Sequence, residues 1–374
     1  MKKRTLALCR ALSLIVLALG LAAGCSTLLP RRQPKTVIPL KLERLAEAGL
    51  SLLWKADLPW GEKVRDSYLL GERLYVVTSK NRLYAFDAQT GSNPWIFQAD
   101  GTIYGRAATD DKDLFLIVGR DILAINPDEG FKDWEISLDF PPASALAVDE
   151  FNIYLGGYDG KCYAIDKRTR FEKWHFTPGG HITGGPTLLA DTVYFGDSEG
   201  RVLALSILDG RQRFRYHAGA AIRDPLARIA DRIYVRAENY QVYSLNSSWQ
   251  GLERRQPAWI FPAGGSVELP PAAVADTVYI AAEGVGVFAA DMATGERKWF
   301  VPGARQFLFL GKESAYLLGA NGMIQVVSKA DGGNRLRLDA RRFDQFVTNT
   351  STDVLYMIRS GDGILAAREA QFRE

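Results

Sequence analysis

Short apolar segments, each containing a Tyr or Phe, recur along the chain from residue 74 to its end. The eight segments are Leu74–Val77, Leu114–Ile117, Ile153–Leu155, Val193–Phe195, Ile233–Val235, Val278–Ile280, Ala315–Leu317 and Leu355–Met357. Their aromatic residues are 37 to 45 positions apart, and most steps are 39 or 40. Strands and turns that repeat with a period near 40 predict the blades of a β-propeller.

Each aromatic segment leads through a turn into a second strand, and then through another turn to a large aromatic residue. The turn Gly156–Gly160, for example, joins two apolar runs and is typical of a hairpin. An Asp, a Gly four residues later and a Trp four residues after that recur, fully or in part, in Asp87/Gly91/Trp95, Asn126/Gly130/Trp134, Asp166/Arg170/Trp174, Gly210/Phe214 and Asp291/Gly295/Trp299. Gly suits a turn at positive φ, and Trp is large enough to wedge between neighbouring sheets.

The two ends of the repeat array complement each other. The last copy, Leu355–Ala370, has no Trp strand after it, whereas Leu53–Ala56 contains a Trp and precedes the first full copy. We therefore predict an all-β fold, a single eight-bladed propeller of four-stranded antiparallel blades over residues 51–374, closed by pairing the N-terminal strand into the last blade. Two copies depart from the pattern: the fifth has an insertion, Ser247–Pro257, and the seventh, Val326–Leu338, lacks its Trp.

The N-terminus has the pattern of a signal peptide. Basic residues precede an uncharged run, Ala11–Gly24, that is shorter than the roughly 20 residues needed to span a bilayer. The small residues before Cys25 resemble the bacterial lipobox, which implies removal of residues 1–24 and lipidation of Cys25. An uncleaved anchor is the alternative. Residues 25–50 are expected to be an extended tether with a short helix at Leu42–Ala48, and Ser26 resembles the signal for sorting to the outer membrane rather than retention in the inner membrane.

Charge and cysteine content narrow the function further. Eight of the 46 Lys and Arg precede Glu43, the first acidic residue, so the remainder has 38 basic against 43 acidic residues. A body with a net charge of −5 argues against binding to nucleic acid. Once Cys25 is lipidated, Cys162 has no partner for an internal disulfide, and its strand-like surroundings predict a buried structural thiol.

Few residues suggest catalysis or metal binding. His175, His181 and His217 lack the spacing of metal ligands, and the glycines of Gly179–Gly185 do not open a helix that could hold a phosphate. Arg65, Arg106 and Arg223 precede aromatic strands by about ten residues and are candidates to line a positively charged central funnel. The alternative is that these arginines are solvated or ion-paired, for instance with Asp66, Asp224 or Glu268.

The tandem pattern resembles the pyrroloquinoline-quinone-type propeller repeat over Leu52–Ala370. Quinoprotein dehydrogenases share this repeat, but that family is longer and typically has an adjacent-cysteine disulfide, a calcium site and a catalytic Asp. The mature chain has no Cys-Cys pair. We therefore expect no enzymatic activity and no cofactor; the alternative is a small-molecule-binding or redox propeller that uses the central funnel.

The signal, lipobox, tether and eight-copy propeller together resemble the B lipoprotein family of the outer-membrane β-barrel assembly machine. This resemblance implies a non-enzymatic periplasmic scaffold that is attached to the membrane only by its lipid and works as a monomer within a complex. Its partner would be an envelope protein such as a barrel-assembly subunit. Ile222 and Arg223 are the candidate partner-binding residues by this resemblance. Trp249 and Arg254 are candidates because an aromatic residue beside arginines is typical of an interface anchor, although Trp249 could instead fold back on its own blade.

Overall fold

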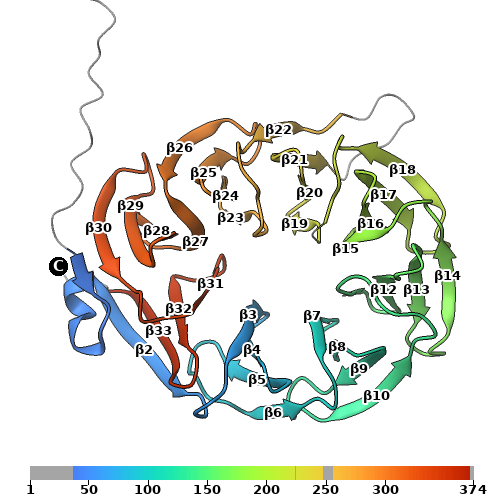
Figure 1. Cartoon of the computed structure of the whole chain (residues 1–374), viewed down its shortest axis with the longest axis horizontal. Helices are drawn as coiled ribbons and strands as arrows, with labels where there is room; N and C mark the ends of the chain where they lie inside the picture. Colours follow the sequence, from blue (N-terminus) through green and yellow to red (C-terminus); the bar gives the residue numbers. More distant parts are fainter. Residues whose placement is uncertain (1–36, 224, 247–255, 371–374) are drawn as a thin grey trace, which may run out of the picture. The chain divides into compact units, whose positions relative to one another are not determined.

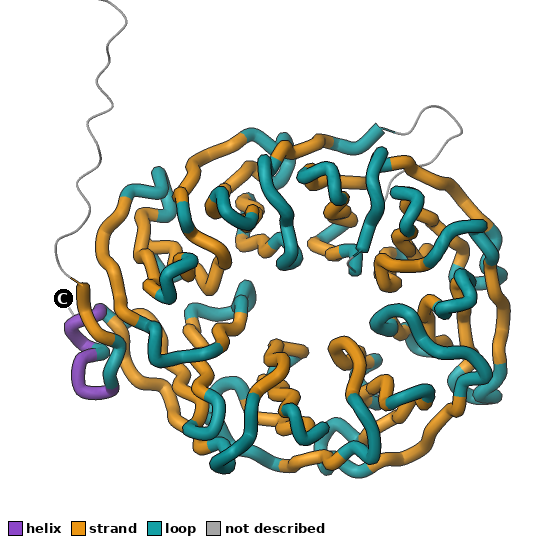
Figure 2. Tube along the Cα trace, viewed as in Figure 1, coloured by secondary structure: helices purple, strands orange, loops and turns teal. Residues whose placement is uncertain are grey.

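The computed structural model describes residues 37–223, 225–246 and 256–370, which belong to one compact unit. Within it, eight sheets surround a central axis, and the strands of each sheet follow one another from the axis to the rim (Figure 1). The described regular structure is β except for two short 3-10 helices near residue 45 (Figure 2). The eight-bladed propeller predicted from the repeat is therefore confirmed.

The first seven blades use strands that are consecutive in sequence. Blades 1 to 3 are β3 (Val64–Leu70), β4 (Arg73–Thr78), β5 (Arg82–Asp87) and β6 (Trp95–Gln98); β7 (Ile103–Thr109), β8 (Leu114–Val118), β9 (Asp121–Ile125) and β10 (Lys132–Ser137); and β11 (Ala147–Val148), β12 (Asn152–Gly156), β13 (Cys162–Asp166) and β14 (Glu172–Phe176). Blades 4 and 5 are β15 (Ile182–Leu189), β16 (Thr192–Asp197), β17 (Arg201–Ser206) and β18 (Gln212–His217); and β19 (Ala227–Ile229), β20 (Arg232–Ala237), β21 (Gln241–Asn246) and β22 (Trp259–Pro262). Blades 6 and 7 are β23 (Ala272–Val274), β24 (Thr277–Ala282), β25 (Gly286–Asp291) and β26 (Arg297–Pro302); and β27 (Ala304–Leu310), β28 (Ser314–Gly319), β29 (Met323–Ser328) and β30 (Asn334–Asp339).

Blade 8 is built from both ends of the described chain. Its strands are β31 (Gln345–Val347), β32 (Val354–Arg359), β33 (Gly363–Glu369) and, outermost, β2 (Leu50–Asp57). β2 runs antiparallel to β33, with Trp54 opposite Ala366. The predicted closure of the ring by the N-terminal strand is confirmed, and it gives β33 a partner along an edge that would otherwise be open.

The residues just before β2 are also part of the propeller. β1 (Val37–Pro39) pairs in parallel with β30 of blade 7, and η1 (Leu42–Arg44) and η2 (Ala46–Ala48) follow it. Ile38, Leu40 and Leu45 are buried in the same cluster as residues of blades 7 and 8. The compact unit therefore begins before the expected boundary at residue 51, because these apolar side chains cover the junction between the two blades, and the helix expected at Leu42–Ala48 is present as two 3-10 helices.

Tryptophans on the outer strands join most blades to the next. The Trp54 ring lies over Gly91 in blade 1, and its Nε1 donates a hydrogen bond to the Ala88 carbonyl at 2.9 Å. A Cβ on Gly91 would come within 2.5 Å of Trp54 Cε3, and Gly91 has a φ of +73°, so both space and backbone favour glycine. The same indole-to-carbonyl bond joins Trp95 to Pro127, Trp174 to Ile207, Trp259 to Met292 and Trp299 to Lys329.

Two departures from this pattern have structural reasons. In blade 3 the glycine position is Arg170, which keeps a positive φ of 64° and places its guanidinium 5.1 Å from the centre of the Trp134 ring. In blade 7 the Trp position is Leu336. The turn on which a Trp would dock does not exist, because β33 and β2 of blade 8 come from opposite ends of the chain. Leu336 packs instead on the cluster that contains Ile38 and Leu45.

Candidate functional site

The antiparallel blades give the ring two different ends. One end has the crossovers from the outer strand of one blade to the inner strand of the next, together with the turns between second and third strands. We call it the crossover face. The opposite end, formed by the turns between first and second and between third and fourth strands, is the turn face. Loops on such rigid scaffolds are where binding residues are usually found.

The inner strands surround a central cavity of about 750 Å³. Two of the expected funnel residues, Arg65 and Arg106, line it. Arg106 pairs with Asp66, with 3.1 Å between Nε and Oδ2, and its guanidinium lies 5.4 Å from the centre of the Tyr68 ring. Arg65 donates to the Ile103 carbonyl. Both arginines therefore join the inner strands of blades 1 and 2, which agrees with the ion-paired alternative for Arg106.

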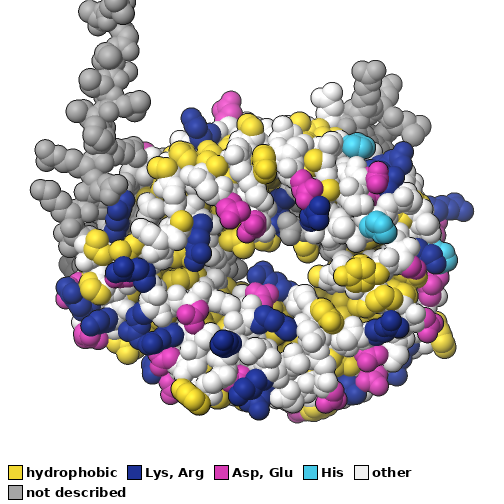
Figure 3. All heavy atoms as spheres, viewed as in Figure 1, with side chains coloured by type: hydrophobic (Ala, Val, Ile, Leu, Met, Phe, Trp, Pro, Cys, Tyr) yellow, Lys and Arg dark blue, Asp and Glu magenta, His cyan; other side chains and the backbone are white. Residues whose placement is uncertain are grey.

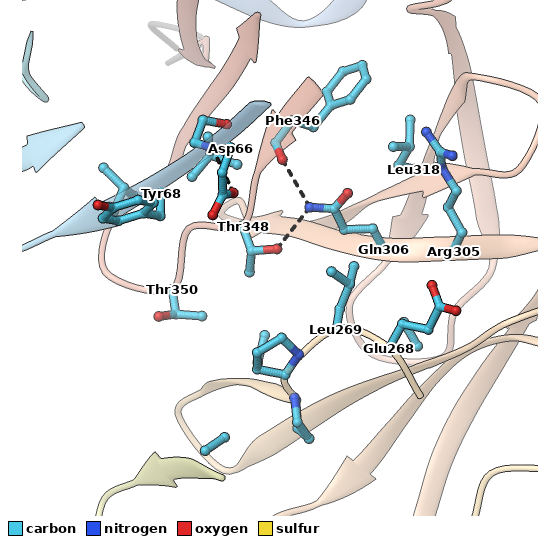
Figure 4. Close-up of a pocket in the computed structure, with 18 of the residues that line it drawn as sticks. Asp66, Tyr68, Glu268, Leu269, Arg305, Gln306, Leu318, Phe346, Thr348 and Thr350 are labelled. Atoms are coloured by element: carbon cyan, nitrogen blue, oxygen red, sulfur yellow. Dashed lines mark hydrogen bonds between the residues drawn. The ribbon is translucent and has the colours of Figure 1, made fainter. Parts of the chain in front are cut away.

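Other side chains at the cavity link neighbouring blades in the same way. Gln306 Nε2 donates to the Phe346 carbonyl and to Thr348 Oγ1, both at 3.1 Å, across the boundary between blades 7 and 8 (Figure 4). Gln345 Nε2 donates at 3.0 Å to the Val64 carbonyl, which joins blade 8 to blade 1. Much of the polar lining of the cavity is thus used to hold the ring together.

The charges that line the cavity are balanced, and Arg223, the third candidate funnel residue, is not among its lining residues. Its charged lining residues are Arg65, Arg106, Arg228 and Arg305, and Asp66, Glu268, Glu283 and Asp344. Basic and acidic side chains both surround the central opening in Figure 3. Four carboxylates therefore balance four guanidinium groups, and the net charge of the lining does not select for an anion.

The lining also fits poorly with the quinone cofactor suggested by the repeat type. That cofactor carries carboxylates and, in the quinoprotein dehydrogenases, is bound beside a calcium ion. No group of three or more His, Cys, Asp and Glu side chains suited to a cation occurs within the described ranges. Of the three histidines, His175 bonds to Glu172 at 2.7 Å, with Nδ1 facing Oε1, on an outer strand. The described residues thus offer neither the positive charge nor the donor set that the cofactor would need.

The two residues expected at a partner-binding loop have different roles. Ile222 is fully buried: it packs against Gly196, and its carbonyl accepts a hydrogen bond from Thr183 Oγ1. The side chain of Arg223 is 70% exposed and pairs with Glu238. Ile222 therefore fixes the crossover loop between β18 and β19, and Arg223 is the member of the pair that a partner could contact.

Tyr240, beside this ion pair in the chain, escaped the sequence analysis. It lies in the turn between β20 and β21, is 53% exposed and has a φ of 62°. In the other seven blades the residue with positive φ in this turn is Asn81, Gly119, Gly160, Gly200, Gly284, Gly322 or Gly361. A bulky residue in this region costs on the order of 1–3 kcal/mol and persists at functional sites. Comparing the turns across the eight repeats would have revealed it.

The remaining sequence candidates lie elsewhere. Cys25, Trp249 and Arg254 are outside the described residues. Asn246 ends β21 and Trp259 begins β22, both at the turn face, whereas Arg223 is on the crossover face. Cys162 is buried in β13, and this burial raises the pKa of its thiol. No helix in the described part of the chain is long and apolar enough to cross a membrane.

Eight four-stranded blades with docked tryptophans define a propeller of the pyrroloquinoline-quinone type of repeat. The chain matches the family model described as "Outer membrane protein assembly factor BamB" over residues 45–152 and 158–307. It belongs to that family. No curated protein matches the chain.

Solved structures show the same fold at low sequence identity. BamB from Moraxella catarrhalis matches with a TM-score of 0.65 and 15% identity, over 85% of this chain and 99% of that one. The computationally designed Ika8 protein matches with 0.63 and 13%, over 83% and 98%. The quinohemoprotein alcohol dehydrogenase ADHIIG from Pseudomonas putida HK5 matches with 0.62 and 12%, over 91% and 79%. Similarity at this level of identity establishes the fold, and the function has to be inferred from the site.

Proposed function

We propose that this protein is a non-enzymatic, lipid-anchored scaffold that binds an envelope protein through the crossover face at Arg223 and Tyr240. The observation that carries the proposal is the backbone strain at Tyr240. In seven blades the turn between the second and third strands has Gly or Asn at the position with positive φ. Only in blade 5, beside the Arg223–Glu238 pair, is this residue a bulky Tyr. An exposed aromatic residue next to an arginine has the composition of an interface hot spot.

Family membership supplies the class of partner. Because the family is that of outer membrane protein assembly factor BamB, we infer that the partner is a subunit of a barrel-assembly complex and that the propeller works in the periplasm. Three features support a role without catalysis: the balanced charge of the cavity lining, the use of its polar groups between blades, and the lack of a cation-binding donor set among the described residues.

The lipid anchor at Cys25 is part of the proposal and is tested separately. Labelled palmitate is expected to enter the wild-type protein, and membrane association is expected to depend on that label. Replacing Cys25 with Ser should abolish both. Unchanged labelling and membrane association in the Cys25→Ser protein would refute the lipid anchor. This result would not affect the proposed binding face, which is tested separately.

The binding face is tested with the purified periplasmic domains of a barrel-inserting subunit as the probe. We expect Arg223→Ala and Tyr240→Gly each to weaken binding about tenfold or more in biolayer interferometry. Tyr240→Gly should at the same time raise the stability of the propeller by about 1 kcal/mol or more, because it relieves the strained φ. The control is Tyr158→Ala, at another exposed tyrosine on the crossover face. Wild-type affinity in both variants would refute the proposal that this surface binds the partner.

A further inference from the structure

Four large apolar side chains are exposed on the turn face of blades 2 to 4. Phe131 is 50% exposed, Phe151 64%, Phe171 75% and Leu208 74%. Phe131, Phe171 and Leu208 belong to the turns between third and fourth strands, and Phe151 to the turn between β11 and β12. We call these four residues the apolar arc.

The other repeats show that the fold does not need apolar residues at these places. The position after the turn glycine, occupied by Phe131 and Phe171, holds Ser92, Arg211, Glu296 and Gly333 in other blades. The position of Leu208, two residues before that glycine, holds Gln89, Asp128, Arg168, Ala293 and Ala330. Exposed aromatic and aliphatic groups that the fold does not require, gathered over adjoining blades, are typical of an interaction site.

Contacts within and between blades hold the turns that carry the arc residues. The Phe151 carbonyl accepts a hydrogen bond from the Lys167 amide at 2.9 Å, in the turn that contains Phe171. Between blades 2 and 3, Lys167 pairs with Asp110, and Arg170 covers the Trp134 ring. Between blades 3 and 4, Trp174 Nε1 donates at 3.2 Å to the carbonyl of Ile207, the neighbour of Leu208. The arc is therefore carried by mutually fixed turns and is a rigid surface.

The charges around the arc favour a cationic partner. Seven carboxylates on the turn face of these blades form no ion pair with another described residue: Asp111, Asp113, Glu129, Asp133, Asp149, Glu150 and Asp166. The corresponding cations are Lys112, Arg168 and Lys173, the last of which donates to Asn152 Oδ1, since the other basic groups pair with acids or cover Trp134. Burial, with the nearby carboxylates of Asp110 and Asp133, raises the pKa of Asp113, which agrees with a locally negative potential.

We propose that the apolar arc is a second docking surface, and that it binds a polypeptide whose apolar side chains are flanked by Lys or Arg. The surplus of unpaired carboxylates complements such a partner. The same carboxylates repel an anionic lipid surface, and a second copy of this chain would bring acid against acid. The surface lies on the opposite end of the ring from Arg223 and Tyr240, so it does not depend on the proposed function of the crossover face.

The proposal is tested with synthetic peptides and the full chain. The probe is a fluorescent peptide in which Phe or Leu alternates with Lys; a matched peptide carries Glu in place of Lys. We expect fluorescence anisotropy to show binding of the Lys peptide at least tenfold tighter than the Glu peptide, with affinity falling as salt rises. The triple variant Phe131→Ser, Phe171→Ser, Leu208→Gln, which borrows residues of other blades, should lose at least tenfold in affinity and keep its melting temperature.

Matched controls separate this surface from the rest of the ring. Trp60→Ser removes an exposed aromatic residue on the crossover face, and Tyr240→Gly disables the proposed partner site there; both should bind the Lys peptide as the wild type does. Equal binding of the Lys peptide by the triple variant, or equal binding of the Glu peptide by the wild type, would overturn the proposal. Arc-dependent binding to phosphatidylglycerol vesicles, or arc-dependent dimerisation in sedimentation, with no preference for the Lys peptide, would overturn it too.

Discussion

Replacing Gly91 with Ala tests whether the docked tryptophans hold the ring together. A Cβ at this position would lie 2.5 Å from Trp54 Cε3, so the indole of the closing strand would have to move. The backbone at φ +73° adds a cost of about 1–2 kcal/mol for a residue other than glycine. Displacing the indole would lose its hydrogen bond to Ala88, about 1 kcal/mol, and part of the packing that makes a Trp→Ala substitution cost about 3–5 kcal/mol. We therefore expect a total of about 4 kcal/mol.

Gly71→Ala is the matched control for this experiment. Gly71 also lies in blade 1 and has a φ of +59°, but nothing stands within 4 Å of its Cβ position. Its replacement should cost only the backbone term of about 1–2 kcal/mol. Chemical denaturation followed by tryptophan fluorescence and circular dichroism would compare the two variants. Equal destabilisation by the two substitutions would show that the contact between Trp54 and Gly91 contributes nothing to closure.

Three further outcomes follow from the structure. Hydrogen bonds from the Thr90 side chain and backbone hold the pKa of Asp87 below its usual value. The Asp87 carboxylate should therefore stabilise the fold fully above about pH 4, and this stabilisation should be lost as the pH falls through the lower pKa of the folded state. In an acid titration of unfolding, Asp87→Asn should lose less stability than the wild type. Burial raises the pKa of the Cys162 thiol, so a thiol reagent should modify it in a Cys9→Ser, Cys25→Ser background only after denaturant is added, and rapid native labelling would contradict its burial. Deleting Leu52–Leu58 removes most of β2 and should cause aggregation or loss of cooperative unfolding, whereas an unchanged melting transition would refute closure by this strand.

The repeat determined how much of the fold the sequence could reveal. Blade number and closure were predictable because every copy keeps its aromatic strand, and because the copy without a Trp strand at the end matches the spare strand containing Trp54 at the start. The pairing of β1 (Val37–Pro39) was not predictable, since three residues that include a proline carry no strand periodicity. These residues pair with β30 because blade 8 has no turn between its third and fourth strands at this position.

The candidate site was less accessible from sequence because its features depend on contacts between distant residues. The sequence named Asp66 as a possible partner of the three arginines but could not tell which of them it pairs with; the structure pairs it with Arg106, 40 residues later in the next blade. In the sequence Ile222 is one apolar residue of a loop, and only the structure shows that its side chain is fully buried. Tyr240, by contrast, was within reach, because the other copies of its turn have Gly or Asn and the comparison needs only the sequence.

Blade 8 imposes an order on the biogenesis of the protein. β2 is among the first strands of the chain and its partner β33 is the last, so β2 cannot pair natively until the seven blades between them have followed. During that interval the edge of β2 is unpaired and open to wrong pairing with other chains. A chain that stops before β33 leaves β2 without its native partner and the ring unclosed. Closure of this blade therefore requires both ends of the propeller, and a truncated product keeps β2 as an unpaired edge that favours aggregation.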